Sequence, residues 1–346
     1  MSLNSDQEAL AQARFARWSK RVWLVENFGG PDALLAMIRK DIEIDPEGLG
    51  ATTEADQDHW RPGLHAKLIH SEPGMFGEIV VIEDSYKFRS MRFGVNGPRQ
   101  SLIDLDHPHA LLLRYAKVAM LGLLWVPRPK AVLIVGLGAG NIPSFFRHHF
   151  PETAIDVVEI DPAVLAVAGN FFNFHKGDSL VVHLMDGRQF IDKQQSPYNM
   201  IIVDAHGTEG PQKHLATLEA LQAFGACLMP GGIMISNTWG ADMNEDFLCV
   251  IDTYRSVFSA CYVAAVKNSV NRLIFAANDP KQAVNFVDLK RRAREVDEQL
   301  MLPFRLEDEL SDENDALNKK LQHEAPRSAR VWRDSVFSQS APPPGS

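Results

Sequence analysis

The sequence has few cysteines, no long apolar run and no excess of basic residues. Its three cysteines, Cys227, Cys249 and Cys261, are odd in number and form no CxxC pair, so neither a zinc site nor a disulfide framework is indicated. They fit reduced thiols in a cytosolic core. The N-terminal stretch lacks the apolar segment of a signal peptide, and the longest uncharged apolar run, residues 118–126, is too short to span a bilayer. We therefore expect a soluble, cytoplasmic protein with no membrane partner.

The charge balance argues against a nucleic-acid partner, because the formal net charge is -9 and phosphate binding requires a basic surface. An acidic surface would suit a cationic substrate, but it also serves solubility alone. Hydrophobic residues make up 45% of the chain and charged residues 23%, which is typical of a globular protein. At 346 residues, the chain is long enough for one large domain and a smaller one.

The chain divides into four predicted segments. Residues 1–60 are expected to form N-terminal helices, and residues 61–105 a small antiparallel β-domain built from the runs GEIVVIED, KFRSMRFG and RQSLIDL. Residues 106–280 form the large domain, which opens with an apolar-periodic helix predicted over residues 107–126. Residues 281–346 begin with a charged helix pattern and end in SQSAPPPGS, whose composition favours disorder.

The large domain alternates strands with helical segments. Strands are predicted over residues 131–136, 154–161, 180–186, 200–204 and 232–237. Two closing runs, CYVAAV and RLIFAAN, are joined by the short turn KNSVN and must pair antiparallel, since a parallel pair needs a crossover. The predicted fold class is α/β: a doubly wound, Rossmann-like, mainly parallel sheet of seven strands, preceded by the small antiparallel β-unit.

The first of these strands runs into GLGAGNIP, where Gly136, Gly138 and Gly140 alternate at a strand-to-helix turn. Glycine lets the backbone turn sharply and lets a ligand lie against it. Taken alone, the pattern also fits a tight turn without a ligand. Asn141 stands where the dinucleotide fingerprint has Gly or Ala, so an ordinary dinucleotide site is not indicated.

Carboxylates follow the next two strands. Glu159 comes about twenty residues after the glycines, where an acidic side chain can accept both ribose hydroxyls, whereas Asp161 with Pro162 is typical of a helix start. Asp186 could accept a hydrogen bond from an adenine amino group, and Gly187 would let the base approach, although an Asp-Gly pair also marks ordinary turns. Because ligands of open sheets bind at the carboxyl ends of the strands, the three features together predict a nucleoside site.

The succession GLGAGNIP, VEIDP, DGRQFI, YNMIIVDA and LMPGGIMIS resembles class I S-adenosylmethionine-dependent transferases over residues 76–280. More narrowly, it is similar to the spermidine/spermine synthases (polyamine aminopropyltransferases), which place a small β-domain before the nucleoside domain. They also carry a Gln at the end of the β-unit, here Gln100. The resemblance implies S-adenosylmethionine or its decarboxylated form as co-substrate, no metal, a small-molecule acceptor such as an amine, and a homodimer.

Several positions depart from that family. Ala139 stands where the family's glycine loop has an Asp that holds the amine of the aminopropyl tail. His109 and Ala110 stand where it has a Tyr-His pair facing the polyamine. In DAHGTEG, Asp204 keeps the first carboxylate of the family's D-S-x-D-P motif, but Gly207 replaces the second, which deprotonates the attacking amine.

The loss of that base limits the chemistry, because an alkyl ammonium with a pKa of about 10 cannot attack until a base removes its proton. His206, Glu209 or Asp204 could take this role, and His206 could equally be a loop residue without one. We therefore predict a spermidine synthase-like transferase that moves a group from sulfur but makes little spermidine. The alternatives are a methyltransferase, which needs less acid and base equipment, and a non-catalytic nucleoside-binding protein. An NAD-dependent dehydrogenase is disfavoured by Asn141 and the closing strand pair.

Overall fold

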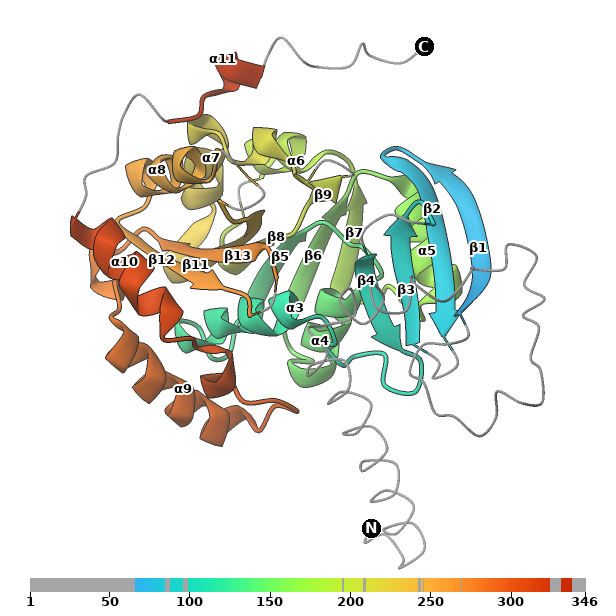
Figure 1. The fold of residues 1–346 in the computed structure, drawn as a ribbon, viewed down its shortest axis with the longest axis horizontal. Coiled ribbons are helices and arrows are strands. Elements are labelled where there is room, and N and C mark those ends of the chain that lie inside the picture. Colours follow the sequence, from blue (N-terminus) through green and yellow to red (C-terminus); the bar gives the residue numbers. More distant parts are fainter. Residues whose placement is uncertain are drawn as a thin grey trace, which may run out of the picture.

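The computed structural model describes residues 66–84, 88–95, 99–194, 196–207, 210–241, 244, 246–267, 269–323 and 331–337. The predicted N-terminal helices (1–60) and the tail predicted to be disordered (338–346) lie outside the described residues. The described chain forms a small antiparallel sheet, drawn in blue to teal in Figure 1, beside a large, mainly parallel sheet with helices on both faces.

The small sheet has four strands in chain order: β1 (Ala66–Gly74), β2 (Gly77–Asp84), β3 (Phe88–Phe93) and β4 (Arg99–Asp104). The three predicted runs correspond to β2, β3 and β4. The edge strand β1 was not predicted, because its sequence AKLIHSEPG contains Pro73 and is not apolar enough to read as a buried strand. Its residues are partly or fully exposed, as suits an edge strand.

The large sheet has the strand order β12-β13-β11-β8-β5-β6-β7. Its strands are β5 (Ala131–Val135), β6 (Ala154–Glu159), β7 (Leu180–Leu184), β8 (Tyr198–Val203), β11 (Leu228–Trp239), β12 (Ala260–Ala265) and β13 (Asn271–Ala277). β11, β8, β5, β6 and β7 are parallel, and β13 runs antiparallel to both β11 and β12. The predicted seven-stranded, doubly wound sheet with its antiparallel final pair is therefore confirmed.

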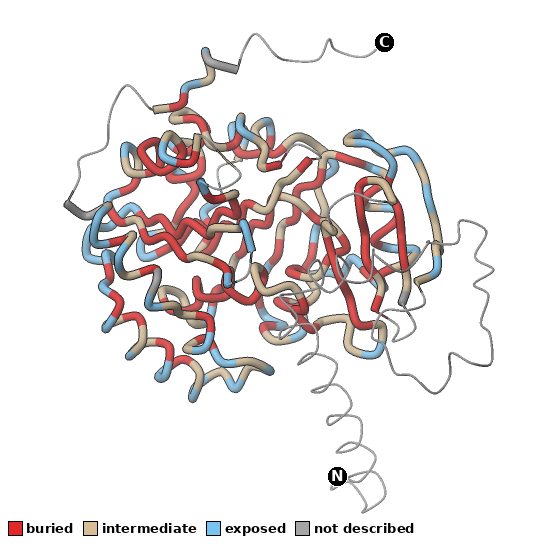
Figure 2. Tube along the Cα trace, viewed as in Figure 1, coloured by how far each residue is buried: buried red, intermediate tan, exposed pale blue. Residues whose placement is uncertain are grey.

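The central strands are apolar without interruption because both of their faces are covered. In β5, Val132 and Ile134 join one hydrophobic cluster, whereas Leu133 and Val135 join the cluster on the opposite face. Successive side chains of a strand point to opposite faces, so only a sheet with helices on both sides buries such a run. Figure 2 shows this burial along the middle of the large sheet.

The helices divide between these two clusters. One face carries α6 (Gly187–Lys193), α7 (Leu218–Ala226) and α8 (Phe247–Val257), and the other carries α3 (Arg114–Ala119), the 3-10 helix η2 (Met120–Leu124), α4 (Asn141–His149), α5 (Pro162–Phe171) and α9 (Phe286–Leu300). The helix predicted over residues 107–126 was wrong in its first third. Residues 104–107 instead form a turn, in which the Asp104 carboxylate accepts the Asp106 N–H at 2.9 Å, and Pro108 follows it.

Two further helices complete the described C-terminal part: α10 (Glu313–His323) and α11 (Asp334–Phe337). The charged helix predicted after residue 280 is α9. α10 covers the edge strand β12 with two asparagines: Asn318 Oδ1 accepts the Val263 N–H at 2.8 Å, and Asn314 Oδ1 accepts the Ala265 N–H at 2.7 Å. These side chains take the place of a further strand and protect the edge of the sheet.

Candidate functional site

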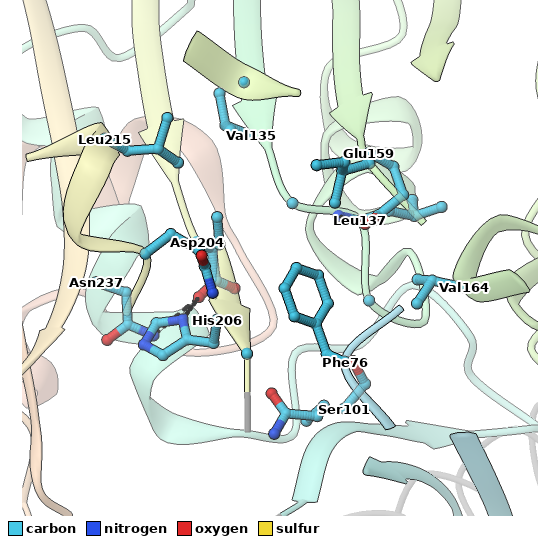
Figure 3. Close-up of a pocket in the computed structure, with 18 of the residues that line it drawn as sticks. Phe76, Ser101, Val135, Leu137, Glu159, Val164, Asp204, His206, Leu215 and Asn237 are labelled. Atoms are coloured by element: carbon cyan, nitrogen blue, oxygen red, sulfur yellow. Dashed lines mark hydrogen bonds and ion pairs between the residues drawn. The ribbon is translucent and has the colours of Figure 1, made fainter. Parts of the chain in front are cut away.

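A cavity of about 250 Å³ lies at the carboxyl ends of the parallel strands, beside the point where the strand order reverses between β5 and β8 (Figure 3). The predicted site residues that line it are Gln100, Gly136, Gly138, Glu159, Asp186, Gly187, Asp204 and His206. Gly140 is not part of the lining; it precedes α4 and packs against Phe174. Glu209 lies outside the described residues.

The glycine turn is fixed by its neighbours before any ligand is considered. Gly136 has a φ of 100°, and a Cβ there would lie 2.3 Å from the backbone oxygen of Asp204. A Cβ on Gly138 would lie 2.5 Å from Ser101 Oγ, and the same Oγ accepts the Ala139 N–H at 2.9 Å. Only glycine fits both positions. β4 of the small sheet therefore holds the loop that borders the cavity.

Glu159 ends β6 as a buried carboxylate. Its Oε2 accepts the Leu137 N–H and its Oε1 accepts the Asp161 N–H, both at 2.9 Å. Burial raises the pKa of Glu159, although the backbone hydrogen bonds act in the opposite direction. The carboxylate has further lone pairs that a ribose hydroxyl can use. Asp161 accepts the Ala163 N–H at 2.9 Å and so begins α5, the role predicted for it.

Asp186 has three hydrogen-bond partners on two elements. Its Oδ1 accepts the backbone N–H groups of Arg188 and Gln189 and begins α6, while its Oδ2 lies 3.0 Å from His214 Nε2. Burial raises the pKa of Asp186, but the hydrogen bonds from His214 and the helix start bring it below its usual value. A Cβ on Gly187 would lie 2.6 Å from Val135 Cγ1, so glycine is needed here for packing.

Asp204 follows β8 and is surrounded by three polar side chains from separate parts of the chain. Asn237 Nδ2 donates to its Oδ1 at 2.9 Å, and the Tyr115 hydroxyl bonds to the carboxylate. Burial first, and then the Asp204 charge, raise the pKa of Tyr115 well above its usual value. His206 Nδ1 lies 3.5 Å from Asp204 Oδ1. The two hydrogen bonds fix the orientation of Asp204, and His206 lies beside it.

The other ring nitrogen of His206 remains available. Nε2 is buried and has no hydrogen-bond partner among the described residues. His206 lines the cavity from β9 (His206–Gly207), which pairs with β10 (Gly210–Pro211) as a short antiparallel ribbon. His206 lies beside a carboxylate and its far nitrogen is unpaired, so this nitrogen can accept a proton from a substrate group that reaches it.

The space beside Gly207 is filled by other side chains. A Cβ on Gly207 would lie 2.7 Å from Gln212 Nε2 and 3.2 Å from Phe76 Cδ1. Phe76 belongs to the turn between β1 and β2, and its ring stands between Asp204 and Glu159 in Figure 3. The turn is held by the Met75 N–H, which donates to Asp161 Oδ2 at 2.6 Å. The position of the family's second carboxylate is therefore occupied by a phenyl ring and an amide.

His109 and Ala110 do not line this cavity. The His109 ring stacks on His148 at the end of α4, with 3.6 Å between ring centroids, and Ala110 is buried near Phe88. Tyr115, a few residues later, is the tyrosine that reaches Asp204.

Sequence reasoning missed the side chains that meet the predicted ones from distant elements. These are Phe76, Tyr115, His214, Asn237 and Trp239. The one available signal was the polar Asn237 at the end of the otherwise apolar run GIMISN, because a polar residue at a carboxyl strand end lies at the ligand edge of such a sheet.

Within the described ranges, no group of three or more His, Cys, Asp and Glu side chains is arranged to hold a metal ion. In the same part of the chain, every helix is too short or too polar to cross a membrane.

Comparison with known proteins identifies relatives of two kinds. The Spermine/spermidine synthase domain matches residues 115–286. The polyamine aminopropyltransferase of Vibrio vulnificus is 32% identical over 216 residues, which cover 60% of this chain and 71% of that protein. The human eEF1A lysine and N-terminal methyltransferase is 32% identical over 208 residues, which cover 55% of this chain but only 30% of that protein.

Solved structures give the same two kinds of neighbour. A probable spermidine synthase from Corynebacterium glutamicum matches with a TM-score of 0.60 at 17% identity, over 79% of this chain and 99% of that one. Human methyltransferase-like protein 13, in complex with SAH, matches with a TM-score of 0.51 at 28% identity, over 60% of this chain and 99% of that one. The sheet order, the cavity at the carboxyl ends of the strands and the Vibrio relative together show that the chain belongs to the spermidine/spermine synthase (polyamine aminopropyltransferase) family of the class I methyltransferase fold.

Proposed function

We propose that this protein transfers a methyl group from intact S-adenosylmethionine to a small acceptor whose nucleophile is deprotonated by His206. The proposal rests on the Asp204–His206 pair. This pair lines a cavity that keeps the carboxylates expected to bind a nucleoside, whereas Gly207 stands in place of the family's base. The human methyltransferase at 32% identity supports methyl transfer on this kind of domain.

The nucleoside half of the cavity fits S-adenosylmethionine. We assign Glu159 to the ribose hydroxyls and Asp186 Oδ2, with its neighbour His214, to the adenine amino side. The turn at Gly136 and Gly138 leaves backbone next to the cavity without side chains in the way. When bound, the co-substrate supplies an electrophilic carbon on a sulfonium, which leaves as a neutral thioether.

Charge in the rest of the cavity opposes the decarboxylated donor and a polyamine acceptor. The carboxylates among the described lining residues are Glu159, Asp186 and Asp204, and only Asp204 lies away from the nucleoside half. An ammonium group taken out of water needs a charged or hydrogen-bonded partner. Arg99 lines the same cavity, two residues before Ser101, which binds the glycine loop. Its guanidinium has the geometry to bind the carboxylate of intact S-adenosylmethionine.

His206 is the residue we assign to proton removal. Asp204, 3.5 Å from its Nδ1, orients the ring and stabilises the imidazolium that forms when Nε2 takes the proton. Asn237 and Tyr115 hydrogen-bond to the Asp204 carboxylate and hold it in place. We therefore assign Asp204 a positioning role. The acceptor nucleophile then needs only alignment with the transferred carbon.

Donor binding tests the proposal directly. Calorimetry should give tighter binding of S-adenosylmethionine than of its decarboxylated form, by about ten- to a hundredfold, the worth of a charge-assisted contact of about 1.5–3 kcal/mol. Arg99→Met should remove this preference, while Lys130→Met, on an exposed residue before β5, should preserve it. Equal or tighter binding of the decarboxylated donor would contradict the proposal.

Aminopropyl transfer is the second candidate, because the Vibrio relative is a polyamine aminopropyltransferase and the family domain matches residues 115–286. In that case His206 or Asp204 would take over the role of the missing carboxylate. Incubation with putrescine and decarboxylated S-adenosylmethionine separates the two candidates. We expect little or no spermidine, since loss of a positioned base alone costs about 10²–10⁴-fold in rate.

A further inference from the structure

We propose that a second cavity, on the other side of Trp239, binds the body of the acceptor, and that this body is a neutral aromatic group carrying an N–H or O–H. The cavity has a volume of about 270 Å³ and lies among the end of β11, α8 and the C-terminal segment. The inference rests on the proposed function, because it assigns the acceptor of the same reaction.

The two cavities share a wall made of side chains. Gln212, Asn237 and Trp239 line both of them. Trp239 also lies next to the assigned base, with 6.4 Å between its ring centroid and that of His206. An acceptor seated in the second cavity therefore contacts side chains that also border the first cavity.

The second cavity is aromatic and neutral inside. Trp239 and Trp332 line it together with Tyr254, which is fully buried and donates its hydroxyl to Ser236 Oγ. Its charged groups among the described residues are Lys213 and Asp246, which pair with each other at 2.9 Å and are 52% and 43% exposed. A polyamine would find no free carboxylate there, whereas a flat apolar ring finds indole and phenol surfaces.

One buried atom on the shared wall lacks a partner. Asn237 is 8% exposed, and its Oδ1 has no hydrogen-bond partner among the described residues. Chemistry distinguishes the amide oxygen from the amide nitrogen here. The neighbouring Asp204 carboxylate can only accept a hydrogen bond, so it must face the Nδ2 donor. The Oδ1 points away from Asp204 in Figure 3.

An unpaired buried acceptor is costly, so a ligand donor that reaches Asn237 Oδ1 gains the full benefit of the hydrogen bond. The same side chain holds Asp204 through its other amide atom. A ligand N–H or O–H bound to Asn237 is thereby placed close to the Asp204–His206 pair.

The C-terminal segment makes the far wall rigid. The Trp332 N–H donates to Thr253 Oγ1 at 2.9 Å, and its carbonyl accepts the Leu218 N–H at 2.8 Å. Asp334 accepts from Arg188 at 2.8 Å and from Thr217 at 2.7 Å. Trp332 is thus held from both sides, as a preformed binding surface requires.

Small aromatic probes test this assignment. With the full chain saturated by S-adenosylhomocysteine, ligand-detected NMR should show binding of indole and 4-methylphenol, and putrescine should not displace them. Val250→Phe, on the cavity side of α8, should abolish probe binding, and Leu248→Phe, on the exposed side of the same helix, should preserve it. Both variants should bind S-adenosylhomocysteine as the unmodified chain does.

Trp332→Ala gives a second test that does not depend on filling the cavity. Loss of one aromatic contact should weaken indole binding by about two- to tenfold and leave S-adenosylhomocysteine binding unchanged. Absence of probe binding to the S-adenosylhomocysteine complex, or probe binding unaffected by both variants, would overturn the acceptor assignment alone. Failure of S-adenosylhomocysteine itself to bind would overturn the proposed function.

Discussion

The affinity for the proposed nucleoside should depend on single side chains, among them Glu159. Its carboxylate already accepts two backbone N–H groups, so Glu159→Gln keeps one oxygen acceptor but sets an NH₂ group against a donor. We expect the affinity for S-adenosylhomocysteine, measured by calorimetry, to fall by about ten- to a hundredfold, from the loss of a hydrogen bond to a charged group.

Asp161→Asn serves as the matched control, because Asp161 accepts from the start of α5 and does not line the cavity. It should lower stability and reduce the affinity much less than Glu159→Gln does. The pH dependence gives a further check. Since burial raises the pKa of Glu159, the ionised acceptor is lost at a higher pH than is usual for Glu, and affinity should fall as the pH drops through that raised pKa. Equal affinity in the Gln variant would remove Glu159 from the site.

Gly207 and Phe76 form a second residue-scale test, because the ring lies where a side chain at 207 would stand. Gly207→Asp should destabilise the chain in urea unfolding, and Phe76→Ala should relieve part of that loss, with a coupling of about 0.5–3 kcal/mol. Met75→Ala, on the exposed neighbour of Phe76, should give no coupling. A penalty for Gly207→Asp that is the same with and without Phe76 would show that the ring does not occupy this space.

The carboxylates that sequence reasoning placed in the site share one property: each lies at the carboxyl end of a strand or follows it at once. Glu159, Asp186 and Asp204 could be placed at one edge because parallel strands end together. Tyr115 and Phe76 could not, since their positions depend on how α3 and the β1–β2 turn pack against that edge. For Asp186, the sequence predicted its place in the site but not its contact with His214. That contact depends on a 3-10 turn (η3, Lys213–Leu215) that no local pattern indicates.

At the scale of elements, the end of α4 carries a histidine cluster that should make stability depend on pH. His149 lies beside His148 and His109, and burial, followed by the charges of those two neighbours, lowers its pKa to about 4. The folded chain therefore resists a proton that the unfolded chain accepts near pH 6.5. The resulting contribution is present above about pH 6.5 and is lost as the pH falls towards 4.

Urea unfolding at several pH values in this window measures the effect. The free energy of unfolding should decrease less steeply with falling pH in His149→Gln than in the unmodified chain. His175→Gln, on an exposed histidine, should leave the slope unchanged. Because His149 is only partly buried, the effect should be smaller than its full pKa displacement implies. Parallel pH profiles for His149→Gln and the unmodified chain would contradict the prediction.

α10 gives a second element-scale prediction. Asn318 accepts the Val263 N–H and donates to the Val263 carbonyl at 2.9 Å, so Asn318→Leu leaves two buried backbone groups unpaired. We expect a loss of about 1–3 kcal/mol in the free energy of unfolding for each group left unpaired, and faster hydrogen exchange in β12. Lys320→Leu, on the exposed face of α10, is the control. Unchanged exchange in β12 would mean that α10 does not protect this edge.

The elements that were predicted correctly have patterns that local packing enforces. β5 and β8 are apolar because both faces are covered, and α9 has a charged exposed face. β1 was missed because an edge strand needs no continuous apolar pattern. The helix containing α3 was predicted too long, because its apolar residues continue into a buried non-helical segment, Leu111 and Leu112. The role of α10 depends on two asparagines that bond to a strand far away in sequence, which periodicity cannot reveal.

At the scale of the whole molecule, the two sheets are expected to behave as one unit. Ser101 of the small sheet accepts the Ala139 N–H in the glycine loop, Asn141 Nδ2 donates to the Leu102 carbonyl at 2.9 Å, and Met75 donates to Asp161. Each of these bonds ends on residues that begin a helix or border the nucleoside edge of the large sheet. The small sheet therefore holds the glycine loop, and we expect ligand binding to slow hydrogen exchange in both sheets.

S-adenosylhomocysteine at a hundred times its dissociation constant should stabilise the chain by about 2.7 kcal/mol. Hydrogen exchange should then slow in peptides from β2 and β3 as well as in those from β5 and β6. Ser101→Ala should weaken this linkage and lower the affinity, because the Ala139 N–H loses its acceptor. Ser90→Ala removes a hydroxyl that bonds only to Ile82 within the small sheet, so it should cost stability without changing affinity. If ligand slows exchange in the large sheet alone, or if both serine variants bind equally well, the small sheet is a separate unit and the glycine loop keeps its shape without it.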